Sequence, residues 1–152
     1  MDADRKHKFP RGTENILVVD DEPSILRLSR RVLQSLGYTV VGVPTPEAAI
    51  GRFAAAPDYF DLVITDMSTL EVSDGRLNSV ISRIRPEIPF LLHTGGISKD
   101  YEKGVIHRVL QKPATLTEIA CAVRGTLDTA AYKGQIPPEP SNPSGICFGA
   151  LP

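Results

Sequence analysis

The sequence predicts a doubly wound α/β fold, in which helices cover both faces of a five-stranded parallel sheet. Short apolar runs rich in β-branched residues alternate along the chain with segments whose apolar residues recur at helical spacing. Right-handed crossovers between parallel strands then place the helices on both faces. With 152 residues, 41% of them hydrophobic, the chain is long enough to bury one such core. One domain is therefore expected.

The strands are predicted where short apolar runs are bounded by turn residues. Two of these runs are continuous, which is typical of strands buried on both faces, and both end abruptly at carboxylates. The first stops at Asp20 and Asp21, and the other stops at Asp66. The five expected strands are Ile16–Val19, Tyr38–Val43, Leu62–Thr65, Pro89–His93 and Val105–Leu110.

The helices are predicted from their start and stop signals. Proline suits a first helical turn, glycine is a common helix stop, and Thr115 with Glu118 forms a capping box. The expected helices run from Pro23 to a stop at Gly37, from Pro46 to Pro57, from Gly75 to about Pro86, over residues 98–103, and onward from Thr115.

The chain is expected to consist of a flexible leader (1–13), one folded domain (14–129) and a proline-rich tail (130–152). Four prolines between Ile136 and Pro143, with Ser, Asn and Gly, leave too little apolar surface to offset the entropy of ordering the tail.

Composition favours a cytoplasmic protein without a direct nucleic-acid or membrane partner. A net charge of -1 gives no general attraction to polyanions, and no apolar stretch approaches the ~20 residues needed to span a bilayer. The two cysteines lie in a predicted helix and in the tail, a pattern that indicates neither a disulfide framework nor a metal-ligand set.

Three acidic residues, Asp20, Asp21 and Asp66, are expected to meet at the carboxyl edge of the sheet, where open α/β sheets bind ligands. Crowded carboxylates repel, so they either hold protons with raised pKa values or bind a hard cation. An all-oxygen set with room for water suits Mg²⁺. Adjacent acids after a strand also occur simply as turn and cap residues.

Phosphoryl transfer needs positioning and neutralisation of the phosphoryl oxygens, and two further strand ends supply suitable groups. The hydroxyl of Thr94 follows the fourth strand and the ammonium of Lys112 follows the fifth. In that chemistry Asp66 is the nucleophile and forms an acyl phosphate. Thr94, which precedes two glycines, could instead be only a turn residue, and Lys112, which precedes a proline, could be only a solvated residue at a strand end.

Taken together, these anchors resemble the receiver domain of two-component response regulators. The resemblance spans Asn15–Leu127 and implies a flavodoxin-like fold with strand order 2-1-3-4-5. The segments that carry it are Val18-Val19-Asp20-Asp21-Glu22, Asp61-Leu62-Val63-Ile64-Thr65-Asp66-Met67, Asp74-Gly75, Thr94-Gly95 and Lys112-Pro113.

The resemblance also implies roles for individual residues. Asp66 accepts a phosphoryl group from a histidine kinase or a histidine phosphotransfer protein. Asp21, Asp66 and the backbone carbonyl of Ser68 bind Mg²⁺, with Asp20 assisting. Thr94 and Lys112 contact the phosphoryl oxygens. The domain is a signalling domain rather than an enzyme, freestanding or part of a hybrid kinase, and a homodimer is left open.

The chain departs from the family pattern in three places. Thr69-Leu70 stands where a Met-Pro pair is usual, and the loop to Gly75 is longer. Val109 occupies the position of an aromatic switch residue, and the short interval between Thr94 and Lys112 predicts a shortened fourth helix. Phosphorylation is therefore expected to couple weakly to the usual output face.

Two alternatives stay open. One is a degenerate receiver that acts as a constitutive protein-interaction module. The other is an aspartyl-phosphate phosphatase on a related sheet, which typically carries a second Asp two residues after the nucleophile. This chain has Ser68 there.

Overall fold

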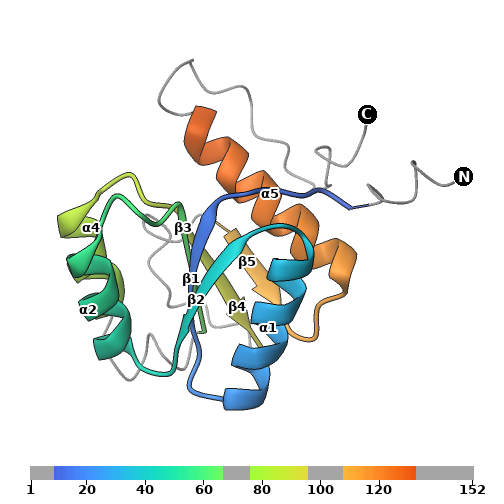
Figure 1. Ribbon diagram of the computed structural model, residues 1–152, viewed down its shortest axis with the longest axis horizontal. Coiled ribbons are helices and arrows are strands. Elements are labelled where there is room, and N and C mark those ends of the chain that lie inside the picture. Colours follow the sequence, from blue (N-terminus) through green and yellow to red (C-terminus); the bar gives the residue numbers. More distant parts are fainter. Residues whose placement is uncertain (1–8, 67–75, 96–107, 133–152) are drawn as a thin grey trace, which may run out of the picture.

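The computed structural model describes residues 9–66, 76–95 and 108–132, which form one five-stranded parallel sheet with helices on both faces (Figure 1). The strand order is β2-β1-β3-β4-β5, so the predicted fold class and strand order are confirmed. The strands are β1 (Asn15–Val19), β2 (Thr39–Val43), β3 (Leu62–Thr65), β4 (Phe90–Thr94) and β5 (Arg108–Gln111).

Helices α1 (Pro23–Ser35) and α5 (Leu116–Tyr132) cover one face of the sheet, and α2 (Pro46–Ala55) and α4 (Arg76–Ile84) cover the other (Figure 1). Each face has its own hydrophobic cluster. Successive residues of a strand point to opposite faces, so Leu17 and Val19 join the α2/α4 cluster while Ile16 and Val18 join the α1/α5 cluster. All four residues of β3 are buried, which explains its uninterrupted apolar run.

The residues predicted to start and stop the helices lie at the helix ends in the structure. Pro23 begins α1, and Gly37 follows its end with φ +101°, a conformation that glycine adopts without a Cβ penalty. Thr45 caps α2, because its Oγ1 accepts a hydrogen bond from Ala48 N at 3.1 Å. The capping box of α5 is formed: Thr115 N donates to Glu118 Oε2 at 2.9 Å, and Glu118 N donates to Thr115 Oγ1 at 3.1 Å.

Some boundaries differ from the sequence prediction. Strand β4 begins and ends one residue later than expected, and β5, described from Arg108, continues to Gln111. Helix α5 continues to Tyr132, past residue 129, where the domain was expected to end. The expected helix over 98–103, most of the leader and the tail from residue 133 lie outside the described residues.

The cysteines require a correction. Cys121 is buried in α5, as its position on a predicted helix suggested, but it is disulfide-bonded rather than a free thiol. The chain's other cysteine, Cys147, lies outside the described residues. Among the described helices, none is both long and apolar enough to cross a bilayer.

Candidate functional site

The sheet register brings Asp20 and Asp66 together. β1 and β3 are neighbours, and Val19 pairs with Thr65, so the next residue of each strand emerges at the same edge. Lys112, which follows β5, reaches across to both carboxylates. Its Nζ lies 3.0 Å from Asp20 Oδ2 and 2.5 Å from Asp66 Oδ2. The predicted convergence of these residues at the carboxyl edge is therefore observed.

Asp20 is held in one orientation by main-chain groups. Asp20 is only 4% exposed, and its Oδ1 accepts a hydrogen bond from Glu22 N at 2.9 Å. Its own backbone N donates to Val43 O at 3.2 Å, which continues the pairing with β2. This leaves Oδ2 directed to Lys112. The turn after β1 therefore positions a buried carboxylate beside Asp66.

Lys112 keeps its positive charge in a partly buried position. Burial is the largest single effect on its pKa and lowers it, but hydrogen bonds to Asp66 and Asp20, together with their negative charges, outweigh burial. The pKa of Lys112 is consequently raised above its ordinary value. The Lys112 ammonium group thus binds both carboxylates, Asp20 and Asp66, at this edge of the sheet.

Thr94 is the last residue of β4 and is buried, with 3% of its surface exposed. Its backbone carbonyl accepts a hydrogen bond from Lys112 N at 2.6 Å, and its register partner is Gln111. The end of β4 therefore fixes where the main chain of Lys112 enters the site.

The predicted metal ligands are only partly assembled. Asp21 is exposed and forms no hydrogen bond or ion pair with the described residues, and Ser68 lies outside them. Within the described ranges, no group of three or more His, Cys, Asp or Glu side chains lies close enough to hold a metal ion. Asp20 and Asp66 nevertheless provide hard oxygen donors side by side, which fits Mg²⁺ and not a soft metal.

His93 is a neighbour of the site that the sequence motifs do not single out. Its Nε2 is buried and has no hydrogen-bond partner among the described residues, and His93 is one of the residues that line a small apolar cavity between the sheet and helices α1 and α5. Burial lowers the pKa of His93, the charge of Lys112 lowers it further, and Asp20 and Asp66 act in the opposite direction. His93 is therefore a neutral imidazole near neutral pH. Its place one residue before Thr94 was the available sequence signal.

Comparison with known proteins identifies the family. A family model for the response regulator receiver domain matches residues 16–124. The chain belongs to this family. A solved receiver domain from Clostridium thermocellum superimposes with a TM-score of 0.71 at 25% identity, covering 81% of this chain and 99% of that one.

Curated relatives place receiver domains of this kind within two-component signalling. The chain is 30% identical over 121 residues to the two-component response regulator ORR25 of Oryza sativa subsp. japonica, which covers 77% of this chain and 17% of that protein. It is 25% identical over 121 residues to the sensor kinase CckA of Brucella abortus, with 77% and 13% covered. The receiver therefore spans under a fifth of the length of each of these two proteins.

Proposed function

We propose that this receiver accepts a phosphoryl group on Asp66 from a phosphohistidine of a histidine kinase or a histidine phosphotransfer protein. It would do so in the cytoplasm, as a signalling domain and not as a turnover enzyme. The observation that supports this most directly is the contact of Lys112 with both Asp66 and Asp20 at the carboxyl edge of the sheet.

The chemistry would be one displacement at phosphorus. A carboxylate oxygen of Asp66 forms a bond to phosphorus, the bond between phosphorus and the donor imidazole nitrogen breaks, and that nitrogen keeps the electron pair. Lys112, already 2.5 Å from Asp66 Oδ2, would neutralise the phosphoryl oxygens. The Thr94 hydroxyl at the neighbouring strand end would donate a hydrogen bond to one of them.

Charge balance supports a role for Mg²⁺. Among the described residues, two carboxylates share one ammonium group, so this part of the site carries excess negative charge before a phosphoryl group arrives. Asp20, Asp21, Asp66 and the backbone carbonyl of Ser68 would hold the ion. When bound, it supplies the positive charge that the phosphoryl oxygens require.

The test is incubation with a small phosphodonor such as phosphoramidate, with and without Mg²⁺, followed by intact-mass measurement. We expect a Mg²⁺-dependent gain of one phosphoryl group that Asp66→Asn abolishes. Asp58→Asn is the matched control, because Asp58 is an exposed acid in the loop before β3. No gain on the wild type, or a gain that survives Asp66→Asn, would contradict the proposal.

A constitutive interaction module is the second candidate, and one observation favours it. Val109, at the position of the aromatic switch, is 38% exposed and provides no ring that could move inward. Such a module would bind its protein partner equally well before and after phosphorylation. Partner binding and biological output that are unchanged in Asp66→Asn would favour this candidate, whereas a large phosphorylation-dependent change in affinity would exclude it.

A further inference from the structure

His93 is a polar residue in apolar surroundings. It lies on β4 and lines a cavity of about 20 Å³ between the sheet and helices α1 and α5. Six of the seven other residues that line this cavity are Leu, Ile or Val, and the seventh is Ser29. The Nε2 atom of His93 is buried and has no hydrogen-bond partner among the described residues. A buried polar atom that the protein leaves unpaired costs free energy, so folding alone favours an apolar residue at this position.

His93 lies close to the path that the Lys112 side chain takes to the two carboxylates. In the sheet, β4 separates β5, which precedes Lys112, from β3 and β1, which precede Asp66 and Asp20. The Lys112 side chain must therefore cross the carboxyl end of β4 to form its two ion pairs. His93 is the last residue but one of β4, and Lys112 N donates a hydrogen bond to the carbonyl of Thr94, the last one.

The charge of Lys112 acts on the His93 imidazole. Burial is the largest effect that lowers the pKa of His93, and the positive charge of Lys112 is the next. The imidazole is therefore close to this cation. A neutral imidazole is a polar group, so it replaces part of the water that the ammonium group loses on burial. A Leu, Ile or Val side chain at this position would not do so.

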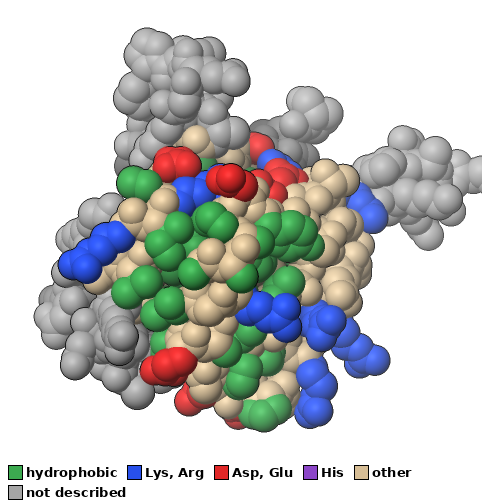
Figure 2. Space-filling model, turned by 60° about the vertical axis from the view of Figure 1, so that its left-hand side comes forward, with side chains coloured by type: hydrophobic (Ala, Val, Ile, Leu, Met, Phe, Trp, Pro, Cys, Tyr) green, Lys and Arg blue, Asp and Glu red, His purple; other side chains and the backbone are tan. Residues whose placement is uncertain are grey.

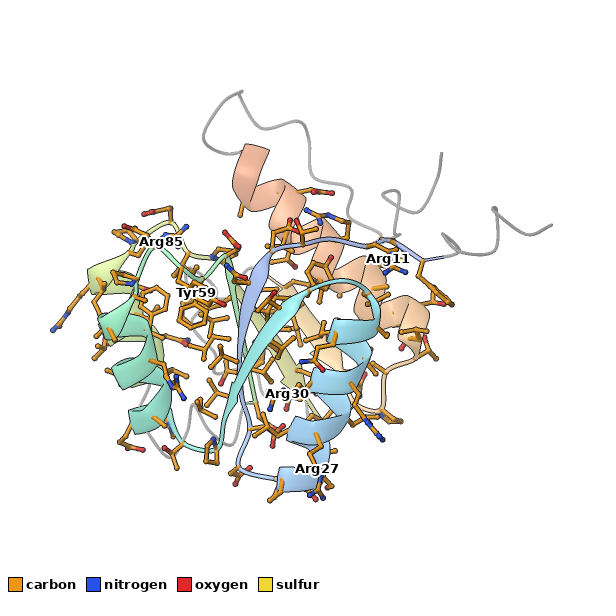
Figure 3. All side chains as sticks on the ribbon, viewed as in Figure 1. Arg11, Arg27, Arg30, Tyr59 and Arg85 are labelled. Carbon is orange, nitrogen blue, oxygen red and sulfur yellow. The ribbon has the colours of Figure 1, made fainter. Side chains whose placement is uncertain are left out.

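Lys112 needs such support because its side chain is long and flexible. A lysine loses much rotamer freedom when its ammonium group is fixed in one place. Figure 2 shows Lys and Arg side chains that project into solvent, and Arg27 and Arg30, labelled on α1 in Figure 3, are exposed in the same way. The Lys112 side chain is instead only 17% exposed, and its Nζ contacts both Asp20 and Asp66.

We infer that His93 is a positioning residue for phosphoryl transfer, an inference that rests on the proposed function. Its neutral imidazole holds the Lys112 ammonium group at the carboxyl end of β4, where this group neutralises the phosphoryl oxygens that arrive at Asp66. The imidazole makes no bond to the phosphoryl group and acts only through Lys112. The chain thus gives up packing stability at one position for a better placed cation.

The test separates the polarity of His93 from its volume. His93→Leu has a similar volume and matches the apolar cavity, whereas His93→Gln keeps a neutral polar group. The rate of phosphorylation by phosphoramidate at saturating Mg²⁺ is measured together with the free energy of unfolding in urea. His93→Leu should be at least as stable as the wild type and be phosphorylated about tenfold more slowly, because Lys112 is less well placed. His93→Gln should stay within about threefold of the wild-type rate.

A second measurement follows Lys112 directly. An ammonium group that carboxylates hold in place gives an observable Nζ signal in heteronuclear NMR spectra, and Lys112→Met identifies this signal by its loss. We expect the signal in the wild type and in His93→Gln, and we expect it to be broadened or lost in His93→Leu. Ser29→Ala is the matched control, because it removes the other polar side chain that lines the cavity. It should change neither the rate nor the signal.

An unchanged phosphorylation rate in His93→Leu would overturn the inference. Equal losses of rate and stability in both His93 variants would also overturn it, because a purely structural role gives that result. Failure of His93→Leu to fold would do the same, since folding would then require the imidazole. A slower His93→Leu with an unchanged Lys112 signal would show that His93 does not act through Lys112. Failure of the wild type to react with phosphoramidate would instead contradict the proposed function itself.

Discussion

Lys112 Nζ lies 2.5 Å from Oδ2 of Asp66, a residue that comes 46 positions earlier in the chain. The same ammonium group lies 3.0 Å from Asp20 Oδ2, so one positive charge forms ion pairs with two neighbouring carboxylates. The parallel sheet creates this arrangement, because the carboxyl ends of its strands meet at one edge. Within the described ranges, the charge balance of these two carboxylates therefore depends on the Lys112 side chain.

Replacing Lys112 should destabilise the fold. In Lys112→Met the side-chain volume is similar, but Asp20 and Asp66 face each other without a cation. We expect a loss of about 1–3 kcal/mol in the free energy of unfolding at neutral pH, measured by urea denaturation. Adding Asp66→Asn to this variant removes the repulsion and should recover part of the loss. An unchanged free energy of unfolding in Lys112→Met would show that the three groups are not coupled.

His93 should make stability depend on pH. Burial and the charge of Lys112 lower its pKa, so between that lowered value and the ordinary value of about 6.5 the unfolded chain binds a proton that the folded chain does not. Stability should therefore fall as the pH drops below about 6.5 and level off below the folded pKa. Urea denaturation at a series of pH values should show a flatter dependence in His93→Gln. The same slope in both proteins would mean that other groups cause it.

The ion pair between Arg124 and Glu14 should stabilise the fold at the end of the sheet opposite to the site. Arg124 binds both oxygens of the Glu14 carboxylate, at 3.0 and 2.5 Å, and both side chains are partly buried. We expect Glu14→Gln to cost about 1–2 kcal/mol in the free energy of unfolding. Asp128→Ala is the matched control: it removes a second partner of Arg124, but that side chain is 58% exposed, so the cost should be under about 0.5 kcal/mol. Equal costs for the two variants would contradict this.

The ion pair between Arg124 and Glu14 should also make the stability of the fold depend on pH in the acid range. Burial, the largest single effect, raises the pKa of Glu14, but hydrogen bonds from Arg124 and from main-chain N–H groups outweigh it, so the pKa is lowered. The contribution of Glu14 to the free energy of unfolding should be complete above the ordinary glutamate pKa of about 4.3. It should be lost as the pH falls through the lowered pKa that Glu14 has in the folded protein. Unfolding measured between neutral pH and about pH 3 should lose this component in Glu14→Gln.

Val109 should limit how far phosphorylation changes the surface of β5. Because the side chain is 38% exposed, Val109→Phe should change the free energy of unfolding by less than about 1 kcal/mol. With beryllium fluoride as a phosphoryl mimic, we expect small chemical-shift changes along β5 and α5 in the wild type and larger ones in Val109→Phe. A full response in the wild type would show that the missing ring is not needed.

Much of the fold was predictable because local chemistry and tertiary burial agree. The continuous apolar run of β3 reports burial on both faces, and Thr45, Gly37 and the pair Thr115 and Glu118 mark helix ends by local hydrogen bonding or backbone geometry. Such signals depend on neighbours within a few residues, so the sequence contains them directly.

The carboxyl-edge site was predictable only in part. Parallel strand ends meet at one edge, which is enough to bring Asp20, Asp66 and Lys112 together. The burial of His93 Nε2 and the pairing of Arg124 with Glu14 depend on packing between segments far apart in the chain, and no local pattern reports them. The disulfide bond of Cys121 likewise depends on three-dimensional proximity.

The most direct test of the central claim locates the phosphoryl group itself. The protein is treated with phosphoramidate and Mg²⁺, and borohydride then reduces any acyl phosphate of aspartate to homoserine, which peptide mass spectrometry locates. The account predicts homoserine at position 66 and at no other acidic residue, with none formed when Mg²⁺ is omitted. Homoserine at Asp20 or Asp21, or unmodified Asp66 after complete digestion, would contradict it.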